Sequence, residues 1–121
     1  MPPYEAKGVG ASYPAGQRRW RIDVPMGLVR IDGDAFEVVS QLPAKGAVPG
    51  MRWAAAGLER AAALRGPLRR SGVVVVGEGG ASAYVFCGEE AAHEILSVLA
   101  QLGVRVDDEP VRLSWWRTVR G

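Results

Sequence analysis

The segment from residue 72 to residue 104 has the sequence GVVVVGEGGASAYVFCGEEAAHEILSVLAQLGV, and it decides most of what the chain predicts about its fold. The valine run is typical of a buried strand. The Glu-Gly-Gly triplet indicates a hairpin turn, and the alternating residues after it indicate a second strand. From Glu89 to Leu102 the apolar side chains fall on one stripe of a helix, which Gly103 ends. The segment therefore predicts a packed core of two strands and a covering helix, with no reactive group directed at a cleft.

The composition is that of an ordinary globular domain, with 121 residues, 48% hydrophobic and 23% charged. A single cysteine, Cys87, excludes an intramolecular disulfide, so nothing favours an oxidising compartment. No apolar run approaches the roughly 18 residues of a membrane span, and the N-terminus lacks the order of a signal peptide. We therefore expect a soluble, cytoplasmic protein that does not enter a membrane.

The first 17 residues are rich in proline and glycine and contain few bulky apolar side chains. Such a composition offers little burial to offset the entropy lost on ordering. The sequence therefore predicts a flexible N-terminal arm over residues 1–17, followed by a single α+β domain over residues 18–121.

Three short strands are expected at the start of that domain. Residues 18–24, 28–32 and 35–40 alternate between apolar and polar side chains, which is the pattern of strands with one buried face. Pro25-Met26-Gly27 is expected to turn the chain after the first, and Asp32-Gly33-Asp34 to form a hairpin between the second and third. The pattern predicts a three-stranded antiparallel meander.

The alanine-rich segment from Met51 to Arg65 decides between two architectures. Its propensity favours a helix, which gives the order β-β-β-α-β-β-α-β: an α+β fold with a mainly antiparallel sheet, two helices and a partly ferredoxin-like arrangement. If this segment is a strand instead, the element order resembles that of a bacterial pleckstrin-homology-type barrel with a C-terminal helix. That type normally ends on its helix, whereas this chain continues into another strand.

No motif in the chain predicts a catalytic, cofactor-binding or metal site. The glycines of residues 77–80 lead into a strand, whereas a phosphate-binding loop must open a helix, so they indicate a hairpin. One histidine and one cysteine cannot fill the four positions of a zinc site. Cys87 and His93 are surrounded by glutamates, which disfavour a reactive thiolate, so we expect a structural cysteine and a solvated histidine.

The C-terminal strand has an unusual outward face, because alternation that buries Trp115 exposes Trp116 among arginines. Three interpretations remain open: a solvated face with arginine stems packed over Trp116, a protein interface, and a nucleic-acid platform. The binding candidates on this face and on the first strand are Arg19, Arg21, Arg112, Trp116 and Arg117.

These observations favour a small non-enzymatic binding or accessory domain that acts through protein contacts and self-associates. The alternative is a nucleic-acid-binding module that uses the Arg and Trp face, although a net charge of +2 is small for that role. A third hypothesis is an enzyme whose site is assembled only at a subunit interface. The expected partner is a protein or a second copy of the chain, and no cofactor is expected.

Overall fold

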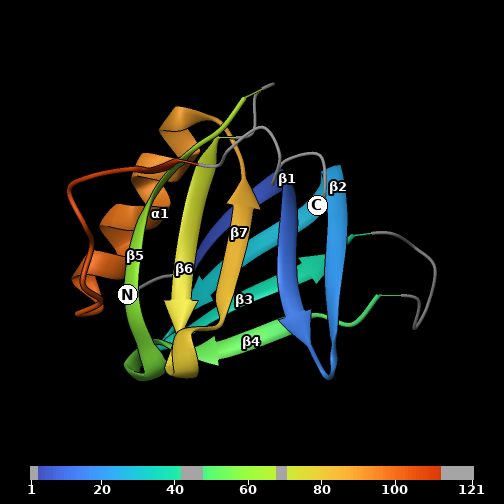
Figure 1. Cartoon of the computed structure of the whole chain (residues 1–121), viewed down its shortest axis with the longest axis horizontal. Coiled ribbons are helices and arrows are strands. Elements are labelled where there is room, and N and C mark those ends of the chain that lie inside the picture. The colour runs from blue at the N-terminus through green and yellow to red at the C-terminus, as the bar shows by residue number, and fades with distance from the viewer. Residues whose placement is uncertain (1–2, 42–47, 68–70, 113–121) are drawn as a thin grey trace.

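The computed structural model describes residues 3–41, 48–67 and 71–112. These residues form one mixed sheet of eight strands and one α-helix (Figure 1). The elements are β1 (Tyr4–Ala15), β2 (Arg18–Asp32), β3 (Ala35–Ser40), β4 (Met51–Ala54), a 3₁₀ turn η1 (Ala55–Gly57), β5 (Leu58–Arg65), β6 (Gly72–Gly77), a 3₁₀ turn η2 (Glu78–Gly80), β7 (Ser82–Phe86), α1 (Glu89–Gln101) and β8 (Val111–Arg112).

The strand order is β4-β3-β2-β1-β7-β6-β5-β8. Neighbouring strands are antiparallel except for β8, which runs parallel to β5. The long strand β2 bends, so that β3 and the second half of β2 pass behind β6 and β7 at an angle (Figure 1). The sheet thereby forms two layers, and strands that bend from one layer to the other make the corner between them.

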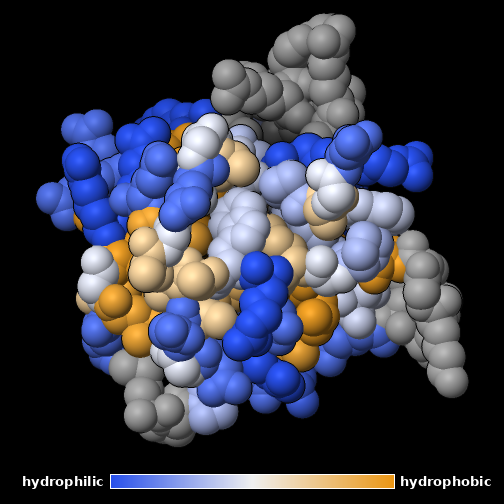
Figure 2. Space-filling view, turned by 90° about the horizontal axis from the view of Figure 1, so that it is seen from below, coloured by the Kyte–Doolittle hydropathy of each residue, from blue (hydrophilic) through white to orange (hydrophobic). Residues whose placement is uncertain are grey.

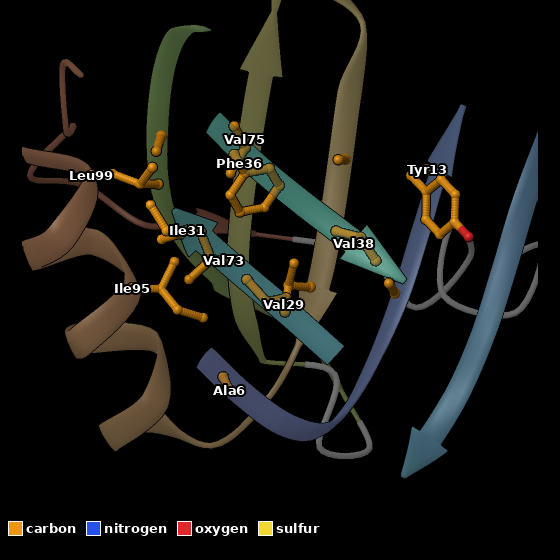
Figure 3. Packing of buried hydrophobic residues seen from close by; sticks show 14 of the residues in the cluster. Ala6, Tyr13, Val29, Ile31, Phe36, Val38, Val73, Val75, Ile95 and Leu99 are labelled. Atoms are coloured by element: carbon orange, nitrogen blue, oxygen red, sulfur yellow. The ribbon is translucent and has the colours of Figure 1, made fainter. Parts of the chain in front are cut away.

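The hydrophobic core fills the space between the two layers. Val29 and Phe36, from β2 and β3, face Val73 and Val75 of β6, and all four side chains are fully buried (Figure 3). Helix α1 packs beside β5 and β6 and directs its apolar stripe at this core. The stripe comprises Ala92, Ile95 and Leu99.

The segment from residue 72 to residue 104 folds largely as its sequence predicts. The valine run is β6, the turn that follows it is η2, and β7 and α1 come after it. Gly79 has a φ of 75° and Gly103 a φ of 89°, in the left-handed region that glycine adopts without strain. The valines are covered on both faces, as expected for a central strand.

The predicted helix from Met51 to Arg65 is wrong, and with it the two-helix, partly ferredoxin-like α+β fold. The segment forms β4, η1 and β5, and β5 pairs with β6 along Ala61, Ala62 and Ala63. The buried valine strand needs backbone hydrogen-bond partners on both sides, and this requirement outweighs the small helix preference of alanine. The observed order is seven strands, then α1 and then the short strand β8, and all eight strands belong to one mixed sheet.

The prediction of a flexible arm over residues 1–17 is wrong for residues 4–15. These residues are β1, which lies between β2 and β7 in the sheet. Val9, Ala11 and Tyr13 are buried in the core, and the Tyr13 hydroxyl donates a hydrogen bond to the carbonyl oxygen of Pro49 at 2.6 Å. The small side chains of the segment suit close packing between two neighbouring strands, so its low hydrophobicity does not keep it outside the core.

The predicted turn at Pro25-Met26-Gly27 is also wrong, because β2 continues through it. The two strands expected at residues 18–24 and 28–32 are one bent strand, and only the hairpin at Gly33 joins β2 to β3 as predicted. Of the meander, the pairing of residues 28–32 with β3 is confirmed.

Candidate functional site

An irregularity in β2 creates the most exposed apolar surface of the described residues. Val9 of β1 pairs with Gly27, and Ala11 pairs with Ile22, so that four residues of β2 lie opposite Gly10 alone. The surplus residues form a bulge, which bends the strand. We call residues 23–26 the β2 bulge.

The β2 bulge exposes two bulky apolar side chains to solvent. Val24 is 62% exposed and Met26 is 39% exposed. Within the part of the chain that the structure describes, Val111 is the only other large apolar side chain that is as exposed as Met26. Two of the three most exposed large apolar side chains among the described residues therefore lie on one short segment.

The bulge depends on a glycine beneath it. A Cβ atom at Gly10 would lie 2.9 Å from Cγ2 of Val24, closer than Cβ atoms in real proteins approach, and 3.2 Å from the carbonyl oxygen of Ile22, which is also tight. At Gly27 the same atom would lie 2.5 Å from the carbonyl oxygen of Val9. The two glycines therefore allow β1 and β2 to stay paired on either side of the bulge.

A cleft of about 690 Å³ lies between the β2 bulge and the start of α1. Its floor includes Gly8 and Gly10 of β1 and Phe86 of β7. Since β2 and β7 flank β1, the two walls of the cleft come from opposite sides of this strand. The lining residues are Gly8, Gly10, Arg21, Ile22, Asp23, Val24, Ser71, Phe86, Cys87, Gly88 and Glu89. The volume is within the range of about 300–1,000 Å³ that protein binding pockets occupy.

Each wall of the cleft carries one carboxylate that belongs to an ion pair. On the β2 wall, Nε of Arg21 lies 3.1 Å from Oδ1 of Asp23. On the α1 wall, Oε1 of Glu89 lies 3.2 Å from Nη1 of Arg65, a residue of β5 outside the lining of the cleft. All four side chains are largely exposed, so both pairs are accessible to a partner and contribute little to the stability of the fold.

Cys87 lies in the cleft, but its surroundings keep the thiol protonated. Burial raises the pKa of Cys87 from 9.0 to about 11. A thiol with that pKa is a poor nucleophile near neutral pH. Among the residues that the structure describes, no three His, Cys, Asp or Glu side chains gather closely enough to hold a metal ion.

Arg19, one of the binding candidates, holds three strands together. Its Nε donates to Oγ of Ser12 at 2.9 Å, and its Nη2 donates to the carbonyl oxygens of Ser12 and Ser82, each at 3.1 Å. The guanidinium also lies over the ring of Tyr84, 5.1 Å from its centroid. Partial burial lowers the pKa of Arg19, and the weaker influence of Tyr84 acts in the opposite direction. The donors of Arg19 are thus directed at β1 and at the start of β7.

The other binding candidates lie apart or outside the described residues. Arg21 shares the outer face of β2 with Arg19 and belongs to the cleft. Arg112 is exposed on β8, and β1, β7, β6 and β5 lie between it and β2. Trp116 and Arg117 fall beyond residue 112, outside the described residues. The structure therefore brings Arg19 and Arg21 together but not Arg112.

A second hollow, of about 350 Å³, lies at the opposite end of the molecule, near η1 and η2. Figure 2 views the molecule from below and shows apolar surface interrupted by hydrophilic residues. Its lining includes Trp53 and Gly77, and a Cβ atom at Gly77 would lie 3.2 Å from the indole. Trp53 is packed against the main core cluster, so this hollow is the margin of the core.

Sequence reasoning did not find the cleft. Gly8 and Gly10 lie in residues 1–17, which were predicted to be a flexible arm. Val24 directly precedes Pro25-Met26-Gly27, which was predicted to be a turn. The available signal was Pro25 within an alternating pattern, since proline inside a strand indicates an edge or a bulge.

In the comparisons with known proteins, no family model and no curated protein matches this sequence. No helix among the described residues has the length and apolar character needed to cross a membrane.

Proposed function

We propose that this chain is a non-enzymatic domain that binds a protein partner through the cleft beside the β2 bulge. The observation that carries the proposal is the placement of Val24, 62% exposed, on the wall of a cleft of about 690 Å³. An apolar projection and an apolar hollow on one surface favour contact with another apolar surface, because association removes both from water.

The distribution of charge around the cleft supports a protein partner. Protein interfaces combine an apolar centre with a polar rim. The cleft is lined by Val24, Phe86 and three glycines, together with one cation, Arg21, and two anions, Asp23 and Glu89. Such a rim is suited to a protein surface that itself carries charges of both signs.

The described residues give less support to the nucleic-acid alternative. The Nε and Nη2 donors of Arg19 are used within the chain, and Asp23 and Glu89 on the cleft would repel phosphate. The cleft therefore favours a protein partner over a nucleic acid.

A phage-display selection tests this proposal. The whole chain is immobilised, and peptides that bind it are selected from a random library. Selected peptides should carry an apolar anchor, and in a ¹⁵N-¹H titration they should shift the amides of Gly8, Gly10 and Gly88. The variant Gly88→Phe should abolish binding, because Gly88 lines the cleft and has an ordinary φ of −69°, and a Cβ atom there has no neighbour within 4 Å.

Gly88→Ser is the matched control, since it changes the same position without filling the cleft. Serine is also favoured at the N-cap of a helix, so the control should fold at least as well as the parent chain. If selected peptides shift amides elsewhere, or bind Gly88→Phe as tightly as Gly88→Ser, the cleft is not the binding site.

A further inference from the structure

We propose that the chain's own C-terminal segment, residues 113–121, covers the cleft and that a protein partner must displace it. The inference rests on the proposed function and adds a regulation of the same site. The segment itself lies beyond the described residues. Four observations support the proposal: the register of β8, the apolar outer face of the sheet, the sequence of the segment and the charges of the cleft.

One row of paired residues leads across the sheet from β8 to the cleft. Val111 of β8 pairs with Leu64 of β5, and Leu64 also pairs with Gly72 of β6. Gly72 pairs in turn with Phe86 of β7, and Phe86 pairs with Gly10 of β1. Phe86 and Gly10 both line the cleft. The described chain ends one residue after Val111, so the C-terminal segment starts beside a row that ends in the cleft.

The outer face of β5, β6 and β7 carries a second apolar cluster along this row. Ala62, Leu64 and Val74 are at most 5% exposed, although they alternate with residues that face the main core. Within the described part of the chain, the partly buried apolar side chains packed against them are Tyr84 and Phe86. An antiparallel sheet with one face on the core commonly presents polar side chains on the other face. This outer face is instead suited to a covering segment with bulky apolar side chains.

The C-terminal segment has the sequence LSWWRTVRG, and its adjacent tryptophans can supply that cover. Neighbouring residues of an extended chain point to opposite sides, so one of Trp115 and Trp116 faces the sheet in either orientation. Trp116 follows Arg112 by four residues, or about 13 Å of extended chain. Three strand spacings separate β8 from β7, or about 14 Å. An indole of the segment therefore reaches Phe86 at the edge of the cleft.

The charges of the segment complement those of the cleft. The segment carries Arg117 and Arg120 and no acidic side chain. Two carboxylates, those of Asp23 and Glu89, line the cleft with a single cation, and both are largely exposed. Asp23 lies on β2, five strand spacings or about 24 Å from β8. Arg120 follows Arg112 by eight residues, or about 26 Å, so its guanidinium reaches the β2 wall.

A nitroxide at the end of the C-terminal segment tests the contact in the whole chain. Gly121→Cys carries the label in a Cys87→Ala background, which leaves one attachment site. The label should broaden the amide signals of Gly10 and Gly88, which line the cleft. It should leave the amide of Gly79 sharp, because η2 lies at the other end of β7. Sharp signals at Gly10 and Gly88 overturn the proposal.

Two pairs of substitutions in the labelled chain identify the group that holds the segment. Trp115→Ser with Trp116→Ser should remove the broadening, because the apolar anchor is lost. Ser114→Ala with Thr118→Ala is the matched control, since it changes two residues of the same segment and keeps both indoles. Circular dichroism should show that both variants fold. Loss of the broadening in both pairs, or in neither, overturns the assignment of the tryptophans.

A mixture of chains shows whether the segment acts within its own chain. The ¹⁵N-labelled chain without nitroxide is mixed with the ¹⁴N chain that carries it, so that broadening can arise only between copies. The amides of Gly10 and Gly88 should stay sharp in this mixture. If they broaden as much as in the directly labelled chain, the segment covers the cleft of a second copy, and the proposal is wrong.

A synthetic peptide of residues 113–121 tests the competition. Added to the Trp115→Ser, Trp116→Ser chain, it should shift the amides of Gly10 and Gly88. The parent chain should bind the same peptide at least tenfold more weakly, because a tethered segment is present at a high effective concentration. Equal affinity for the two chains, or binding to neither, overturns the proposal.

The two proposals fail separately. If the nitroxide leaves the cleft amides sharp but phage-selected peptides shift Gly8, Gly10 and Gly88, the cover is wrong and the cleft remains a protein-binding site. If the nitroxide broadens the cleft amides but selected peptides bind elsewhere, even on the chain that lacks both tryptophans of the segment, the segment covers the cleft and the protein-binding function is wrong.

Discussion

Replacement of Arg19 by alanine should destabilise the fold by about 2 kcal/mol. A loss of this size would show that Arg19 stabilises the fold and is not a free arginine available for binding a partner. The change removes three hydrogen bonds, with donor–acceptor distances of 2.9, 3.1 and 3.1 Å. Each such bond contributes a net stabilisation of about 0.5–1.5 kcal/mol, and the contact with the Tyr84 ring about 0.5–1 kcal/mol. The arginine side chain is ordered in the folded state, at a cost of up to about 2 kcal/mol of rotamer entropy. Alanine avoids this cost, which offsets part of the loss and leaves a net destabilisation of about 2 kcal/mol.

Arg21→Ala is the matched comparison, because Arg21 lies on the same face of the same strand. Its ion pair with Asp23 is exposed, and such pairs contribute about 0–1 kcal/mol. Arg19→Lys completes the series, since it keeps the charge but cannot reproduce the forked donors that reach both Ser12 and Ser82. It should lose most of the stability that Arg19→Ala loses.

Urea denaturation measures the free energy of unfolding of the three variants, and thermal melting provides a second readout. At about 4 °C per kcal/mol for a chain of this size, Arg19→Ala should lower the melting temperature by about 8 °C. Arg21→Ala should lower it by about 4 °C or less. If Arg19→Ala and Arg21→Ala lower the free energy of unfolding by the same small amount, Arg19 does not stabilise the fold and is again a candidate for binding a partner.

Three further changes test the fold and the cleft. Leu99→Ala should cost about 2–5 kcal/mol in urea denaturation, because Leu99 is fully buried between α1 and the sheet; a cost below about 1 kcal/mol would show that α1 is not docked there. Gly72→Ala should prevent folding, judged by circular dichroism, because the added Cβ atom would collide with the backbone of Val85; a folded variant would contradict the pairing of β6 with β7. At pH 8, Cys87 in the folded chain should react with a thiol reagent about 100-fold more slowly than in urea, since its pKa is raised from 9.0 to about 11. The same shift favours the folded state below pH 9.0, and this stability is lost as the pH rises to about 11, a decline that Cys87→Ala should reduce; rapid labelling, or no change in the decline, would refute the burial of the thiol.

The part of the fold that the sequence predicts correctly is the part with strong local signals. In β6 and β7 the β-branched and aromatic residues favour strands, and Gly79 and Gly103 occupy positions with positive φ. The helix between Glu89 and Gln101 combines an apolar stripe with acidic residues in its first turn, where the helix dipole favours them. Each of these signals acts within a few residues, so it can be recognised without knowledge of the rest of the chain.

The part that fails depends on partners that are distant in sequence. Alanine favours a helix over a strand by only a fraction of a kcal/mol per residue, and such a preference is overridden when a strand must pair. Residues 61–63 become part of β5 because the valines of β6 need a neighbour. Residues 4–15 become a strand because β2 and β7 both need one between them. Neither requirement is visible within the segment itself.

The cleft is difficult to predict for a different reason: the space in it is created by atoms that are missing. The binding candidates predicted from the sequence are arginines and a tryptophan. One of them, Arg19, uses its Nε and Nη2 donors for hydrogen bonds within its own chain. The cleft instead depends on Gly8 and Gly10, which carry no chemistry of their own. Gly10 cannot be replaced without pushing Val24 away, so a change there would alter the bulge together with the cleft. Gly88 lines the same space with nothing within 4 Å of an added Cβ atom, and it is therefore the position where the cleft can be filled while the bulge stays intact.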